Sequence, residues 1–338
     1  MLRRINNMAF RMKHAWLPAL CMLVLTTSCE RRELTYYMES EISITADWRR
    51  ADLEEEESYG ATLIIYPKDG GKPQVVLMGE RERITVRLSR GKYDAILFNR
   101  SFDDFRNLLF RGEESLETLE AYAKQTEVRT GTRIITAAPD KLASAMIRDF
   151  EVTENMLGNY APAASRTVTC PEGACRIKFT PKLLTRKVQV QLHIQGINNL
   201  RQATCRLNGV PLSIFLHDGS TGNELGIQEF TMKDVTLNEG SRKDGTLTGT
   251  LNLFGFDPEV ATHVTLQALL VDDKTIVEQQ IGNVKVQEST DGSGIITLYL
   301  EAAGTEPLPD VKPSGSTDSG FNADVDEWGD ETVTEMPI

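Results

Sequence analysis

The sequence of 338 residues predicts an all-β protein made of two successive antiparallel β-sandwich domains. Three observations predict this class. Apolar and polar residues alternate with a period of two over many short segments, and clusters of Gly, Pro and Asp separate these segments about every ten residues. The strand signals also lack the regular alternation with helix signals that βαβ units require. We therefore expect one sandwich in residues 29–155 and a second in residues 165–302.

Residues 1–28 have the pattern of a bacterial export signal that ends at a lipidated cysteine. Four basic residues precede the apolar stretch AWLPALCMLVL, and small residues then lead to Cys29. The stretch is about half the ~20 residues that a membrane-spanning helix needs, and Pro18 interrupts it. We expect cleavage before Cys29 and acylation of its thiol. The alternative is an ordinary signal peptide with another cut site, because Leu25 lies four residues before the cysteine and three is usual.

The first predicted domain contains short strands and one short helix. Residues 61–66 (ATLIIY) and 93–98 (YDAILF) are apolar runs, and residues 84–88 alternate cleanly. Residues 113–124 (EESLETLEAYAK) place Leu116 and Leu119 at helical spacing, with Glu residues at the beginning, where they suit the helix dipole. We expect a helix here, inserted in the strand-rich domain.

The second predicted domain follows a connecting segment over residues 154–166. Its clearest strand is 188–194, in which every second residue is apolar. The remaining expected strands have the same short length and are 203–207, 212–216, 230–235, 247–254, 264–271, 276–281 and 295–300.

The composition changes at residue 303, where an acidic tail rich in Pro, Gly and Ser begins. Such a composition is typical of a disordered segment. Within it, residues 321–326 alternate like a lone strand, with Phe321, Ala323 and Val325 on one side. The tail is either merely solvated, or it holds a detachable strand that pairs with a sheet edge in the same or another molecule.

Two cysteines of the mature chain are close in sequence. Cys170 and Cys175 lie in TCPEGAC, and an exported protein favours a disulfide between them over two free thiols. Cys205 alternates with Ala203 and Leu207, which predicts a buried thiol in a core.

Composition and motifs exclude several functions. The leader holds four basic and no acidic residues, so the mature chain has 33 basic against 49 acidic residues and a net charge of −16. This charge disfavours binding by charge both to nucleic acid and to anionic membrane surfaces. The sequence contains no nucleophile elbow, no phosphate-binding loop and no paired-histidine metal motif. We expect no enzymatic activity, no catalytic residue, no metal and no cofactor.

Beyond these patterns, the chain resembles a family of Bacteroidales lipoproteins with a domain of unknown function, related to fimbrillin-like and minor fimbrial anchor proteins. The resemblance spans most of the mature chain and contains no catalytic motif. The segments that carry it are the Cys29 start, ATLIIYPKDGG, RGKYDAILFNRSFDDFRNLLFRG, LTRKVQVQLHIQGINNLRQATCRLNGVP and GFNADVDEWGDE.

The resemblance implies two transthyretin-like sandwich domains, a lipid-anchored surface or periplasmic location, and a role in pilus-like assembly, in which a strand of one subunit pairs with the next. We therefore expect a lipid-anchored cell-envelope protein, exposed at the surface, that serves as an anchor or accessory subunit of a surface filament. Its partners would be the membrane and other fimbrial proteins. The alternative is a monomeric lipoprotein that captures glycans or proteins at the cell surface.

Overall fold

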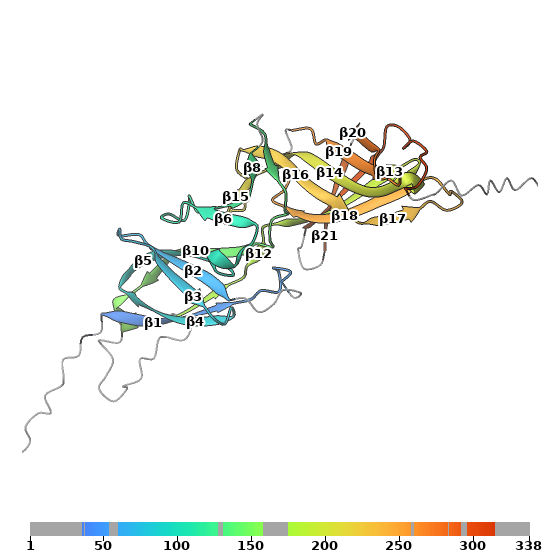
Figure 1. Ribbon diagram of the computed structural model, residues 1–338. Coiled ribbons are helices and arrows are strands. Elements are labelled where there is room, and N and C mark those ends of the chain that lie inside the picture. The colour runs from blue at the N-terminus through green and yellow to red at the C-terminus, as the bar shows by residue number, and fades with distance from the viewer. Residues whose placement is uncertain are drawn as a thin grey trace, which may run out of the picture.

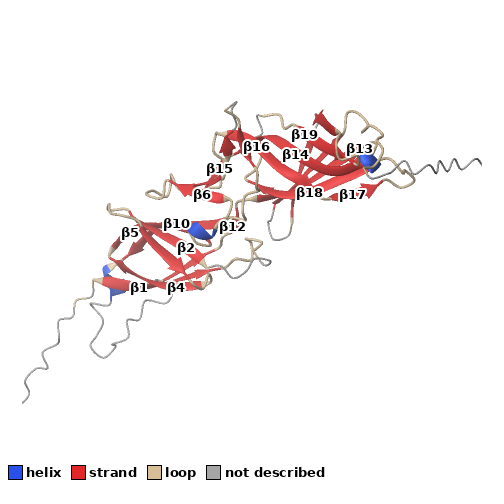
Figure 2. Cartoon of the chain, viewed as in Figure 1, coloured by secondary structure: helices blue, strands red, loops and turns tan. Residues whose placement is uncertain are grey.

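The computed structural model describes residues 36, 38–53, 60–127, 131–157, 175–257, 260–282, 284–291 and 296–314. In these ranges the protein is all-β, as predicted, with three short 3-10 helices as its helical elements (Figures 1 and 2). The strands form five sheets, which we name A (β11-β1-β4), B (β12-β10-β5-β2-β3), C (β15-β7-β6), D (β20-β19-β14-β16-β9-β8) and E (β17-β18-β13-β22-β21).

Sheets A, B and C form the N-terminal lobe. Their strands are β1 (Glu39–Ala46), β2 (Ala61–Pro67), β3 (Gln74–Met78), β4 (Arg83–Ser89), β5 (Gly91–Asn99), β6 (Leu108–Arg111), β7 (Glu120–Ala123), β10 (Ala143–Val152), β11 (Arg176–Phe179), β12 (Lys182–Leu183) and β15 (Ser213–Phe215). The 3-10 helices η1 (Phe102–Asp104) and η2 (Glu154–Leu157) lie in its connections.

Sheets D and E form the C-terminal lobe. Their strands are β8 (Thr126–Glu127), β9 (Arg133–Ile135), β13 (Arg186–Ile194), β14 (Leu200–Pro211), β16 (Leu225–Met232), β17 (Asp234–Leu237), β18 (Gly245–Leu253), β19 (Val264–Leu270), β20 (Ile276–Ile281), β21 (Lys285–Thr290) and β22 (Ile296–Ala303). The 3-10 helix η3 (Ile197–Asn199) precedes β14.

Sheet B is covered on both faces, which explains the apolar runs in its central strands. In β2, Leu63 and Ile65 face one core together with residues of sheet A. Their neighbours Ile64 and Tyr66 face the other core, together with residues of sheet C. A strand that is buried on both faces requires a continuous apolar run instead of an alternating one.

The second core continues from sheet B through sheet C and between sheets D and E. In β13 the side chains of Val188, Val190 and Leu192 are fully buried, and the polar residues between them face outward. The apolar residues of the pattern that predicted this strand therefore face the core, and its polar residues face solvent on the other side of sheet E. Cys205 is buried in the facing sheet, as its pattern predicted.

Strand pairing crosses the predicted boundary between the two domains. β11 pairs with β1 and β12 with β10, although both strands follow residue 165. In the opposite direction, β9 precedes that boundary and pairs with β16 of sheet D. A domain boundary within residues 156–164 would therefore assign hydrogen-bonded strands to different domains. The exact division of the chain into domains stays a prediction.

The predicted helix over residues 113–124 is wrong. Residues 113–119 form turns, and β7 begins at Glu120. Leu116 and Leu119 are buried, but the apolar positions continue at Ala121 and Ala123, with the spacing of a strand. Pairing of β7 with both β6 and β15 stabilises the extended backbone, so tertiary contacts override the local helical signal.

The prediction of an unstructured tail from residue 303 is wrong for its first part. Residues 304–314 follow β22 and pack on the C-terminal lobe, and Leu308 is buried. The backbone N–H of Leu308 donates to the carbonyl of Gln195 over 2.9 Å. The side chain of Asn199 donates to Asp310 over 2.8 Å. Within the described ranges, no helix has the length and apolar character that crossing a bilayer requires.

Candidate functional site

Most of the predicted site residues lie outside the described residues. This holds for Cys29, Cys170 and the strand residues Phe321, Ala323 and Val325. Among the described cysteines, Cys205 is a free thiol, whereas Cys175 is disulfide-bonded. Because Cys170 is not described, the pairing of Cys170 with Cys175 stays a prediction.

An incompletely covered sheet face is the most distinctive surface of the N-terminal lobe. Val75 and Leu77 lie on β3, the edge strand of sheet B, and are 47% and 63% exposed. They oppose Ile64 and Thr62 of β2, both of which are completely buried. Cross-strand partners share a face, so this apolar face of sheet B continues beyond the part that other residues cover.

Sheet C is the cover that stops short of β3. β15 lies over the β10 side of sheet B, because Ser144 donates a hydrogen bond to the carbonyl of Leu216 just beyond β15. β6 is at the opposite side of sheet C, and its Phe110 stacks on Phe98 of β5 with ring centroids 5.5 Å apart. The free edge of β6 therefore faces the side on which β3 lies.

The backbone of β6 is available for pairing along this edge. The N–H of Lys124 donates to Asn107 next to β6, whereas the N–H of Ala123 donates to Leu212 on the other side of β7. Because the direction of backbone groups alternates along antiparallel strands, the amide and carbonyl of Leu108 and Phe110 point away from β7. β7 is the only described strand that pairs with β6. We call β6 and the exposed residues Val75 and Leu77 the open edge.

An ion pair between an exposed arginine and a buried carboxylate fixes the end of β6 to β7. The Nε of Arg111 donates to Glu120 over 2.5 Å, and the carboxylate is buried. Burial raises the pKa of Glu120, but hydrogen bonds from Arg111 and Ser213 lower it by more, so its pKa lies below the usual range. Glu120 is therefore ionised at neutral pH and connects all three strands of sheet C.

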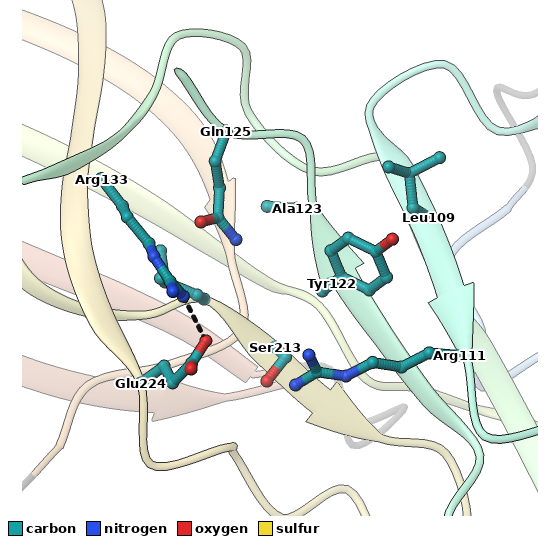
Figure 3. Close-up of a pocket in the computed structure, with 9 residues that line it drawn as sticks. Leu109, Arg111, Tyr122, Ala123, Gln125, Arg133, Ser213 and Glu224 are labelled. Carbon is teal, nitrogen blue, oxygen red and sulfur yellow. Dashed lines mark hydrogen bonds and ion pairs between the residues drawn. The ribbon is translucent and has the colours of Figure 1, made fainter. Parts of the chain in front are cut away.

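A small cleft lies beside sheet C where the two lobes meet (Figure 3). It has a volume of about 270 Å³. Figure 3 shows an ion pair between Arg133 and Glu224 on one side of it. On the other side the guanidinium of Arg111 lies over the ring of Tyr122, 5.4 Å from its centroid. We call this the junction cleft.

The junction cleft has the chemistry of a binding surface. Its two arginines are each paired with a glutamate: Arg133 with Glu224 in the lining, and Arg111 with Glu120 of β7. The residues in contact with it include a tyrosine, a serine and a glutamine, which suit a neutral polar ligand. Within the described residues, no group of three or more His, Cys, Asp or Glu could hold a metal ion.

Sequence reasoning missed the open edge. Val75 and Leu77 alternate within QVVLM, as core-facing residues of a strand do, so nothing local marks them as exposed. Their exposure depends on where the edge of sheet C lies, which pairing over long sequence distances determines. One feature of the sequence bears on this exposure, namely the Pro- and Gly-rich turn before β3. Proline within sheets is confined mainly to edge strands, and β3 is the edge strand of sheet B.

Comparison with known proteins agrees with the resemblance predicted from the sequence. The chain is 21% identical to a proposed fimbrium anchoring subunit, Fim4B, of Bacteroides ovatus, over 96% of this chain and 98% of that protein. The crystal structure of a proposed adhesin from Bacteroides ovatus matches 75% of this chain and 86% of its own length, with 18% identity and a TM-score of 0.52. This likeness shows that the two proteins share a fold.

The fimbrial anchor protein Mfa2 from Porphyromonas gingivalis is also similar, with 10% identity over 68% of this chain and 77% of its own and a TM-score of 0.38. A model of the family described as "Domain of unknown function (DUF5119)" matches residues 28–231, which is more than half of the chain. The protein therefore belongs to the DUF5119 family.

Proposed function

We propose that this protein is a lipid-anchored cell-envelope protein that acts as an anchor or accessory subunit of a surface filament. The observation that carries the proposal is the match along almost the whole chain to a proposed fimbrium anchoring subunit. In this proposal the two lobes are transthyretin-like sandwich domains that form a non-enzymatic body. The acylated Cys29 attaches this body to the outer membrane.

The lipid anchor rests on the pattern of the leader. A basic start, a short apolar stretch and small residues precede Cys29, and β1 begins ten residues after it. More than one acyl chain gives stable attachment, at about 0.8 kcal/mol per buried methylene. We expect Cys29→Ala to release the protein from the membrane fraction into the soluble fraction. Cys205→Ala is the control, and a Cys29→Ala protein that still sediments with membranes would contradict the anchor.

Contact with filament subunits would occur by strand addition at the open edge. An incoming strand could pair with the outward backbone groups of Leu108 and Phe110 and extend sheet C by one strand. The same strand would lie over Val75 and Leu77 and remove their side chains from water. A strand with apolar residues at alternate positions is required, and residues 321–326 of a second molecule have this pattern.

Site-specific photocrosslinking tests this contact. A photoreactive amino acid in place of Phe321, in the complete protein on intact cells, is expected to crosslink to residues 74–78 or 108–111 of a second copy of this protein. Val75→Lys with Leu77→Lys should abolish the product, because lysines would place two charges under the incoming strand. The matched control is Val235→Lys with Leu237→Lys on β17, another edge strand with two half-exposed apolar residues. If only the β17 pair abolishes crosslinking, the open edge is not the acceptor.

Capture of a neutral glycan is the second candidate function, and the junction cleft is the observation that favours it. Tyr122 provides an aromatic surface and Gln125 a polar group, beside two arginines that are each paired with a glutamate. A protein that gives no crosslink to another sandwich protein, but binds oligosaccharides and loses that binding on Tyr122→Ala, would establish capture in place of assembly.

A further inference from the structure

The outer face of sheet A and the described residues next to the ends of its strands carry a local excess of positive charge in this acidic protein. Residues 39–50, 81–89 and 176–182 contain eight basic and four acidic residues, a net charge of +4. The whole chain has a net charge of −12, and residues 185–314 contain 10 basic against 16 acidic residues. We call the eight cations the basic face: Arg49, Arg50, Arg81, Arg83, Arg87, Arg176, Lys178 and Lys182.

Strand register places four of these cations on the two sides of β1: Arg83 and Arg87 of β4, and Arg176 and Lys178 of β11. Thr45 of β1 lies between Lys178 of β11 and Arg83 of β4. All three side chains are on the outer face, because the residues that alternate with them, such as Ile44 and Phe179, are buried in the core. The charge cluster therefore exists only in the folded protein.

Half of the basic face has no acidic partner within the described ranges. Among the described residues, Arg50, Arg83, Arg176 and Lys182 form no ion pair, whereas the other four cations do. Two of the unpaired cations, Arg50 and Lys182, line a concavity of about 500 Å³ at the ends of β1 and β11. The one acidic residue in its lining, Asp47, is already paired with Arg49 and Lys178. The concavity is therefore suited to an anionic group.

The position of the basic face points to a membrane as the source of that anion. Figure 1 shows β1 and β4 on the side of the N-terminal lobe that is remote from the C-terminal lobe. Glu39 at the start of β1 is ten residues from Cys29, and ten residues span at most about 36 Å. A membrane that holds Cys29 is thus within reach of the basic face.

We propose that the basic face binds anionic lipid headgroups and holds the N-terminal lobe against the membrane surface. The anionic phosphates would contact the unpaired cations, and each Lys or Arg near such a surface contributes about 1 kcal/mol. This contact would direct the C-terminal lobe away from the membrane. The inference rests on the proposed lipid anchor for its orientation, but binding by the basic face itself needs no acyl chain.

Vesicle flotation of the lipid-free protein tests the proposal. The chain from residue 29 with Cys29→Ala is expected to float with vesicles of phosphatidylcholine and phosphatidylglycerol, and not with vesicles of phosphatidylcholine alone. The triple variant Arg83→Glu, Arg176→Glu and Lys182→Glu should bind roughly a hundredfold more weakly. Added salt should weaken binding by the original chain, because charges at exposed sites are screened beyond about 10 Å at 0.1 M.

The matched control reverses three unpaired, exposed lysines of the C-terminal lobe, Lys187→Glu, Lys233→Glu and Lys285→Glu. It changes the net charge by the same amount and should leave flotation nearly unchanged. Equal losses in both triple variants, or no flotation of the original chain with anionic vesicles, would overturn the proposal. Binding to a soluble polyanion without binding to vesicles would also overturn it. Release of Cys29→Ala from cell membranes is a separate result and tests only the acyl anchor.

Discussion

Sheets A and C each have three strands and each covers one face of sheet B, but they leave different surfaces. Sheet A covers one face of sheet B as far as β3, so that Leu63, Leu97 and Met78 are buried, and its outer face is polar and basic. Sheet C covers only part of the opposite face and leaves Val75 and Leu77 exposed. The comparison shows that one central sheet supports a closed side and a side that leaves apolar residues exposed beside an edge strand.

The difference follows from which strands complete each cover. β11 returns from beyond residue 174 to pair with β1, so sheet A gains a third strand beside its β1–β4 pair. In sheet C the third strand, β15, also comes from later in the chain, but it pairs with β7 on the side of β10. The β6 side receives no described strand, and the uncovered strip remains there.

The largest expected effect comes from truncating a side chain on the closed side. Leu63→Ala should lower the free energy of unfolding by about 2–5 kcal/mol, because it leaves a cavity between sheets A and B. Chemical denaturation followed by circular dichroism measures this. Leu77→Ala alters an exposed residue next to Val76, the cross-strand partner of Leu63, and should change this free energy by less than about 0.5 kcal/mol. Similar losses in both variants would mean that the two sides are covered alike.

A smaller effect is expected from the buried carboxylate of sheet C. Glu120→Gln should lower the free energy of unfolding by about 1–3 kcal/mol at neutral pH, because Arg111 and Ser213 lose an ionised partner. Glu224→Gln is the control, since Glu224 pairs with Arg133 at an exposed site where an ion pair contributes at most about 1 kcal/mol.

The pH dependence of this effect has a definite sign. The pKa of Glu120 is lower in the folded protein than its ordinary value of 4.5. Its contribution to stability is therefore complete above pH 4.5 and is lost as the pH falls through the folded-state pKa. Denaturation at a series of pH values measures the free energy of unfolding of the original protein and of Glu120→Gln. The difference between the two should shrink as the pH falls below 4.5. A difference that stays constant on acidification would show that the charge of Glu120 does not matter.

The thiol of Cys205 shows how far a local pattern can be informative. Alternation with Ala203 and Leu207 predicted a buried cysteine, and burial raises the pKa of its thiol to about 12. A thiol with that pKa is protonated and unreactive at neutral pH. The same pattern cannot distinguish a buried strand position from an exposed one at an edge, as Val75 and Leu77 show.

The sequence by itself determined the fold class. A strand with one face on a core has apolar residues at every second position, a strand between two cores has a continuous apolar run, and both patterns can be read locally. It predicted the strand over 188–194, the burial of Cys205 and the resemblance to fimbrial anchor proteins. It predicted a helix over residues 113–124, where pairing with two strands makes residues 120–123 extended. Only the tertiary structure decided that residues 120–123 are extended. It also decided how residues 304–314 pack, where the open edge lies and which cations form the basic face. Each of these depends on contacts between distant segments, and no local periodicity records them.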